Sequence, residues 1–298
     1  MEERSLDFLN YLRVQKNYSI NTISSYERDL HVFRDYLNKE GLSYLDLDYS
    51  DVRLFYNYMD DMDYAKSTVC RMLSSIRSFY NYLSRNGYVS VNVFKYASNP
   101  KKDKLLPKFL YSNELDSLFM VPDLSTPLGV RDRLILELLY STGIRVSELV
   151  NIKVNDFCYD DFSLKVFGKG SKERIVYFDD CTYYYLEKYF SVRPLLLKDK
   201  GDSSYLLLNK NGTCLTDRGV RLILDNICKK SDLNEKISPH VIRHTFATHL
   251  LNKGCDITTV KELLGHESLR ATQVYTHVTN ERLKDVYYET HPRNKIDL

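Results

Sequence analysis

The residues between Ser238 and Tyr275 combine cationic side chains with a phenol. His240, Arg243 and His266 precede Tyr275, and no carboxylate stands among them at metal-ligand spacing. Such a set suits an anionic substrate, because histidine and arginine donate hydrogen bonds to oxyanions, and it offers a phenolic nucleophile. An unperturbed phenol has a pKa of about 10, so neighbouring cations must stabilise the phenolate or the transition state that leads to it.

The segment that begins at Ser238 is predicted to be a helix. Ser238 is a good N-cap, and Pro239 is a good first helical residue. His240 and Arg243 are three residues apart, so they share one face of the first turn. Both would lie at the end of the helix that favours anions.

A zinc site is the alternative interpretation of this helix. His240 and His244 have the i, i+4 spacing of a helical zinc pair. The glutamate of a His-Glu-x-x-His motif is absent, and the cationic Arg243 lies between the two histidines. We therefore expect no metal site, and we expect His244 and His249 to be structural.

Two further segments place a cation next to a bend in the chain. Arg145 follows Gly143 at the start of a predicted helix, where an ordinary surface ion pair with Glu148 would also explain it. Lys169 lies between two glycines at the tip of a predicted hairpin. Most lysines at such tips are solvated, but flanking glycines let the backbone bring a lysine close to a ligand. An amine whose pKa shifts readily suits a general acid.

The order and spacing of these motifs resemble those of tyrosine recombinases, the phage integrase family, and most closely the bacterial Xer type. Tyr275 is one of 25 tyrosines, so composition alone does not select it. The motifs that carry the resemblance are His240-Val-Ile-Arg-His-Thr-Phe-Ala-Thr-His-Leu-Leu, Leu264-Gly-His, Thr272-Gln-Val-Tyr-Thr-His, Thr142-Gly-Ile-Arg-Val-Ser-Glu-Leu and Gly168-Lys-Gly-Ser-Lys-Glu-Arg. A weaker likeness continues into the first hundred residues, so the resemblance covers nearly the whole chain.

The resemblance implies six catalytic residues and one supporting carboxylate. The nucleophile would be Tyr275, and the general acid that protonates the departing 5′ oxygen would be Lys169. The other residues would hold the scissile phosphate or orient those that do: the phosphate ligands Arg145, Arg243, His240 and His266, and the orienting Glu148. The resemblance implies no metal and no other cofactor.

The implied function is the cutting and rejoining of DNA at specific sites through a 3′-phosphotyrosyl link and a Holliday junction. In a Xer-like role the protein would resolve dimers of chromosomes or plasmids. A homo-tetramer, or a hetero-tetramer with a related recombinase, would act on double-stranded DNA with a core of two half-sites. The alternatives are a recombinase of a mobile element and a type IB topoisomerase. A catalytically inactive DNA-binding regulator would be a different class of protein.

Hydrophobic spacing predicts a mainly helical fold with a small antiparallel sheet. From residue 5 to about residue 96, apolar residues recur in three- and four-residue steps, which indicates a bundle of about four helices. Leu164 and Val166 alternate with polar residues and the same period returns after a turn, so a β-hairpin is expected here. Five later segments are helical by pattern: 181–189, 216–230, 239–252, 257–264 and 281–288.

A stretch rich in proline and lysine divides the chain. Residues 99–108 interrupt every periodicity and are expected to form a linker. Residues 1–98 would be a helical SAM-like core DNA-binding domain, and residues 109–298 a tyrosine-recombinase catalytic domain. Leu283, Val286 and Tyr287 near the end of that domain form an apolar stripe that must be buried. The resemblance implies that it docks on a neighbouring protomer, and packing on its own domain is the alternative.

The formal net charge of +2 over 298 residues does not by itself indicate a nucleic-acid partner. DNA binding would require basic residues to gather on one face of the fold. Arg71 and Arg77 are candidates for such contacts in the first domain, although a solvated position is the ordinary explanation for a surface arginine.

Six cysteines occur without any Cys-x-x-Cys spacing, so they are expected to be reduced and mostly buried. The longest apolar stretches are too short to span a membrane, and the first residues lack the apolar core of a signal peptide. We therefore expect a cytoplasmic protein without membrane association.

Overall fold

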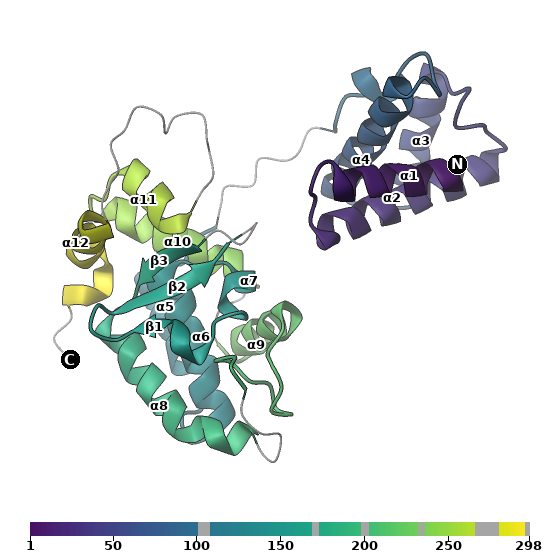
Figure 1. Ribbon diagram of the computed structural model, residues 1–298. Helices are drawn as coiled ribbons and strands as arrows, with labels where there is room; N and C mark the ends of the chain where they lie inside the picture. Colours follow the sequence, from purple (N-terminus) through teal and green to yellow (C-terminus); the bar gives the residue numbers. More distant parts are fainter. Residues whose placement is uncertain are drawn as a thin grey trace. The chain divides into compact units, whose positions relative to one another are not determined.

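The predicted combination of helices and one small sheet is present in the computed structural model, which describes residues 1–100, 108–168, 173–197, 203–231, 233, 236–265 and 280–295. The chain divides into two units, Met1–Leu105 and Leu106–Leu298 (Figure 1). Each unit has its own hydrophobic core. Within the described residues, the strands form one three-stranded antiparallel sheet. The assignment of DNA binding to one unit and catalysis to the other stays a prediction.

Aromatic rings hold the first unit together. Phe33 on the second helix lies with its ring centroid 5.1 Å from that of Phe55 and 5.5 Å from that of Phe94, and all three are fully buried. Each buried aromatic ring removes a large apolar area from water. The elements so joined are α1 (Glu2–Val14), α2 (Ile20–Glu40), α3 (Tyr49–Asp61), α4 (Lys66–Arg85) and the 3₁₀ helix η1 (Val93–Tyr96). The predicted bundle of four helices is confirmed.

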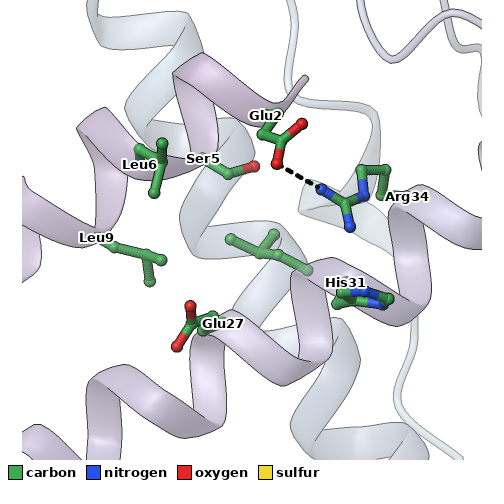
Figure 2. Close-up of a pocket in the computed structure, with 8 residues that line it drawn as sticks. Glu2, Ser5, Leu6, Leu9, Glu27, His31 and Arg34 are labelled. Carbon is green, nitrogen blue, oxygen red and sulfur yellow. Dashed lines mark ion pairs between the residues drawn. The ribbon is translucent and has the colours of Figure 1, made fainter.

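A pocket lies between α1 and α2 of this unit (Figure 2). Glu2 and Arg34 form an ion pair of 3.4 Å across it, but the two side chains are 80% and 29% exposed. Exposed pairs of this kind contribute only about 0–1 kcal/mol. The pocket is a surface groove between two amphipathic helices, and it contains none of the predicted site residues.

Helix α6 forms the centre of the second unit. It is buried on almost every side and packs against α8 and α10. The described elements of this unit are α5 (Ser112–Met120), α6 (Pro127–Thr142), α7 (Val146–Leu149), η2 (Val154–Asp156), β1 (Phe157–Cys158), β2 (Ser163–Phe167), β3 (Glu173–Tyr177), α8 (Asp180–Leu197), α9 (Asp217–Lys230), α10 (Pro239–Asn252), α11 (Ile257–Leu264), α12 (Asn280–Thr290) and η4 (Pro292–Lys295). The five helical segments expected after residue 180 are all present.

The predicted hairpin is confirmed. Strands β2 and β3 lie side by side (Figure 1) and pair antiparallel. Leu164 is opposite Val176, and Phe167 is opposite Glu173. The tip of the hairpin, residues 169–172, lies outside the described residues. Strand β1 was not predicted, because its two residues are too few to show any periodicity.

The last helix packs on its own unit in this single chain. Tyr287 of α12 is 1% exposed, and Leu283 and Val286 pack against the core of the second unit. The expected burial of the apolar stripe is therefore met within the chain, and docking on a neighbouring protomer stays a prediction.

A buried ionic cluster fixes the segment that follows α12. Glu137 of α6 is fully buried and pairs with both Arg133 and Arg293 of η4. The guanidinium of Arg293 also lies 4.0 Å from the ring centroid of Phe119. Burial raises the pKa of Glu137, while the nearby cations of Arg293 and Arg133 oppose this rise. The cluster joins the end of the described chain to its central helix.

All six cysteines are free, as expected, but only Cys70, Cys228 and Cys255 are buried. Half of the cysteines are therefore buried, which is fewer than the majority that the sequence analysis expected. Across the described ranges, no helix is both long enough and apolar enough to cross a membrane.

The substitution Arg293→Met should lower the free energy of unfolding of the second unit by about 3 kcal/mol, because it removes one partner of a buried charge. The matched control is Lys284→Met on the neighbouring helix, which removes a partly exposed pair with Asp161 and should cost less than about 1 kcal/mol. Urea unfolding of both variants measures the difference. Equally small losses would show that the buried cluster does not anchor the segment.

Candidate active site

Arg145 lies where α6 ends and α7 begins. Gly143 caps α6 with a φ of 59°, a left-handed conformation that glycine adopts without strain, and a Cβ atom there would lie 2.5 Å from the ring of Phe246. The turn places Arg145 at the N-cap of α7. Its Nη1 donates to Glu148 Oε1 at 2.8 Å, and its Nη2 donates to the carbonyl oxygen of Gly265 at 2.9 Å. The guanidinium is held on two sides while 36% of the side chain stays exposed.

Arg243 lies on α10, which begins as the sequence predicted. Ser238 is the N-cap, and its side chain accepts a hydrogen bond from the Val241 N–H. The buried guanidinium of Arg243 donates to the carbonyl oxygen of Gly143 at 2.5 Å and to that of Leu264 at 2.6 Å. Both carbonyls are at helix C-termini, where the partial negative charge favours a cation. Arg243 thus ties the end of α6 to the end of α11.

A buried carboxylate joins Arg145 to an arginine that the sequence analysis did not select. The side chain of Glu148 is 2% exposed, and each of its oxygens accepts two hydrogen bonds. Two come from the backbone N–H and Nη1 of Arg145, at 2.7 and 2.8 Å. The other two come from Nη1 and Nη2 of Arg174 on β3, at 2.6 and 2.9 Å.

The sequence carried little sign of the role of Arg174. It ends a charged Ser-Lys-Glu-Arg string beside a turn, and charged residues in such strings are most often solvated. Its contact with Glu148 spans 26 residues, so no helical or strand period connects the two positions. The one available signal was its place at the end of the motif that begins at Gly168.

The cluster holds more positive than negative charge. Burial and, to a smaller extent, the cation of Arg145 lower the pKa of Arg243 to about 10, so the group stays protonated at neutral pH. Burial alone would raise the pKa of Glu148, but hydrogen bonds from Arg174 and Arg145 outweigh burial and lower it. Within the described part of this cluster, one ionised carboxylate therefore stands among three guanidiniums. A bound anion would neutralise the excess charge, and planar guanidinium donors match phosphate oxygens.

The histidines of α10 differ in burial: His240 is exposed, His244 is half-buried and His249 is buried, and the roles expected of them stay predictions. His240 is exposed in the first turn, one turn before Arg243, where it is open to a ligand. His249 is buried, and its Nδ1 forms a hydrogen bond of 2.9 Å with the hydroxyl of Tyr140. Burial lowers the pKa of His249, in keeping with a neutral structural group.

Comparison with known proteins gives a match over both units. The description "Phage integrase family" applies to residues 108–282, and "Phage integrase, N-terminal SAM-like domain" applies to residues 6–87. The chain belongs to the phage integrase family. Its sequence is 46% identical to tyrosine recombinase XerC of Oceanobacillus iheyensis over 96% of this chain and 95% of that protein. It is 42% identical to tyrosine recombinase XerC of Staphylococcus haemolyticus over 99% of both chains.

Solved structures of tyrosine recombinases share the fold of this family member. A XerH site-specific recombinase bound to palindromic difH substrate matches with a TM-score of 0.73 and 23% identity, over 95% of this chain and 84% of that one. A lambda integrase dimer bound to a core site matches with a TM-score of 0.70 and 17% identity, over 94% and 99%. The assignment to tyrosine site-specific recombinases of the Xer type is confirmed.

Three of the six predicted catalytic residues of this recombinase, Lys169, His266 and Tyr275, lie outside the described residues. Described neighbours of two of them contact the cluster. Gly265, which precedes His266, accepts a hydrogen bond from Arg145. The strand that follows Lys169 carries one of the three arginines. The catalytic roles of all six residues stay predictions.

The two tyrosines of α12 are poor substitutes for Tyr275 as a nucleophile. Tyr287 is fully buried, and burial raises its pKa well above the usual value. Burial also raises the pKa of Tyr288 to about 12, and its hydroxyl donates to the carbonyl oxygen of Phe178 at 3.4 Å. Because burial raises the pKa of both phenols, neither forms a phenolate readily at neutral pH.

Arg71 and Arg77, the candidates for DNA contact, have partners within the first unit. Arg71 pairs with the buried Asp29 and stays exposed on its other side. Arg77 donates to the carbonyl oxygens of Phe94 and Ala97 at 2.9 and 2.8 Å, so it stabilises η1. DNA contact by these arginines stays a prediction.

If the arginine cluster is an anion site, inorganic phosphate should stabilise the recombinase. At constant ionic strength, phosphate at ten times its dissociation constant adds about 1.4 kcal/mol and raises the midpoint of thermal unfolding by a few degrees. Arg145→Gln should abolish this increase, because it removes a guanidinium with an exposed face. Arg4→Gln, which removes a surface arginine that pairs with Asp7 in the other unit, is the control and should leave it intact. An unchanged increase in Arg145→Gln would place phosphate binding elsewhere.

Proposed function

We propose that this recombinase cuts and rejoins double-stranded DNA by transferring the scissile phosphate to Tyr275 and back. The observation that carries this proposal is the cluster in which Arg145 and Arg243 are held at the ends of three helices with an excess of positive charge. A phosphodiester gains negative charge as a fifth oxygen attacks it. Fixed guanidiniums stabilise that charge more than they stabilise the ground state.

In the cleavage step, the phenol of Tyr275 gives up its proton to His240 as its oxygen forms a bond to phosphorus, and the bond between phosphorus and the 5′ oxygen breaks. Arg145 and Arg243 hold the two non-bridging oxygens, and His240 and His266 add further hydrogen bonds. Lys169 donates a proton to the departing 5′ oxygen. The products are a 3′-phosphotyrosyl link and a free 5′-hydroxyl, and the number of phosphoester bonds is unchanged.

Rejoining reverses these steps with the 5′-hydroxyl of a partner strand. Two duplexes and four protomers would exchange strands in this way through a Holliday junction, in line with the lambda integrase tetramer that was solved on such a junction. The four protomers would be copies of this chain or would include a related recombinase. Each would occupy one of two half-sites in a core of duplex DNA.

We assign this activity to Xer-like resolution of chromosome or plasmid dimers in the cytoplasm. The support is the likeness to XerC proteins over nearly the full length of both chains. Six free cysteines are in keeping with a reducing compartment.

The substitution Tyr275→Phe should abolish the covalent protein–DNA adduct and leave half-site binding within about threefold, because it removes only the nucleophilic oxygen. A suicide substrate nicked beside the cleavage point traps the adduct, and denaturing gels measure it in the presence of EDTA. Tyr288→Phe is the matched control and should form the adduct as the unaltered protein does. An adduct that persists in Tyr275→Phe would place the nucleophile elsewhere, and loss of cleavage in EDTA would revive the zinc interpretation.

A further inference from the structure

Arg174 is the arginine of the cluster to which the predicted reaction gives no role. Its guanidinium faces Glu148 edge-on, with Nη1 and Nη2 each donating to a different carboxylate oxygen at 2.6 and 2.9 Å. Both side chains are largely buried, at 17% and 2% exposed. A two-point contact of this kind fixes the orientation of both planar groups, which a single contact cannot do.

The backbone position of Arg174 connects this contact to the hairpin. Arg174 is the second residue of β3 and pairs with Val166 of β2, at the end of the ladder next to the hairpin tip. Lys169 is in that tip. The clamp on Glu148 therefore ties the hairpin, at the end of its ladder next to the tip, to α7, whose N-cap is Arg145.

The stem of Arg174 also packs against the residue before His266. A Cβ atom at Gly265 would lie 2.9 Å from both Cδ and Nε of Arg174, so a glycine is needed for this approach. Gly265 adopts a φ of 63°, and its carbonyl oxygen accepts a hydrogen bond from Arg145. Arg174 thus contacts α7, whose N-cap is Arg145, and Gly265, which precedes His266. It also lies on the strand that follows Lys169.

Loss of Arg174 would also change the balance of charge between Arg145 and Glu148. Arg145 uses two guanidinium N–H groups on partners among the described residues, one on Glu148 and one on Gly265. Without Arg174, the buried carboxylate would have Arg145 as its only remaining guanidinium partner in the described part of the chain. A carboxylate left in that state would draw Arg145 toward itself and repel an incoming phosphate.

We propose that Arg174 is a positioning residue for DNA cleavage: by clamping Glu148 at two points, it holds the carboxylate away from the phosphate and leaves Arg145 free to face it. This inference rests on the proposed function, because it assumes that Arg145 binds the scissile phosphate. It assigns Arg174 no contact with DNA. A lysine at this position keeps the charge but cannot bind both oxygens in one plane.

The test uses Arg174→Lys and Arg174→Gln in the full chain, with single-turnover cleavage of a suicide substrate and affinity for a half-site measured separately. We expect cleavage to fall about 100-fold in both variants, because a small misplacement of a catalytic group has an effect of this size. Half-site affinity should change less than about threefold. The control is Arg131→Lys, since Arg131 also pairs with a carboxylate, that of Asp132, and donates to a backbone carbonyl. Folded Arg131→Lys should cleave as the unaltered protein does.

A second variant separates positioning from a merely structural role. In a Glu148→Gln background the carboxylate is gone, so adding Arg174→Lys should slow cleavage by less than about threefold further. An additive 100-fold loss in the double variant would overturn the inference, as would normal cleavage by Arg174→Lys. A loss confined to half-site affinity would instead make Arg174 a direct DNA contact. If the unaltered protein forms no adduct, the proposed function itself fails, and this result is distinct from each of the others.

Discussion

The buried carboxylate of Glu148 is the interaction on which the rest of the site depends. Three guanidiniums repel one another, and burial strengthens that repulsion because little water is present to screen it. Glu148 offsets it by accepting four hydrogen bonds, two from Arg145 and two from Arg174. The oxygens of the carboxylate are fully hydrogen-bonded within the protein. Its single negative charge offsets one of the three guanidiniums, and a bound phosphate would offset the remaining positive charge.

Helix ends supply the second part of the arrangement. Arg243 donates to carbonyls at the C-termini of α6 and α11, and Gly143 lets the chain turn sharply enough for Arg145 to follow. These contacts replace water around a buried cation without neutralising it. Both guanidiniums are therefore held in place by protein contacts alone, which is the condition that the proposed electrostatic catalysis requires.

Local sequence patterns predicted the helices and the hairpin. They did not predict the side-chain contacts between residues far apart in the sequence, which depend on long-range packing. The bounds of α10 and α11 follow from an N-cap and a regular apolar period, and both agree with the prediction. The pairing of Arg145 with Glu148 is also local, at i, i+3. The contact between Arg174 and Glu148 and the burial of Arg293 against Glu137 join residues that are 26 and 156 positions apart. No short-range period records such contacts, so only the fold identifies them.

The most direct test of the account is to remove charge from the scissile phosphate rather than from the protein. A methylphosphonate replaces one non-bridging oxygen with a neutral methyl group. On ordinary DNA, Arg145→Ala and Arg243→Ala should each lose cleavage about 100-fold to 1,000-fold. If both arginines act by stabilising charge on the phosphate, these losses should shrink at least about tenfold on the methylphosphonate. Equal losses on both substrates would contradict the account, because the arginines would then serve the fold and not the charge of the transition state.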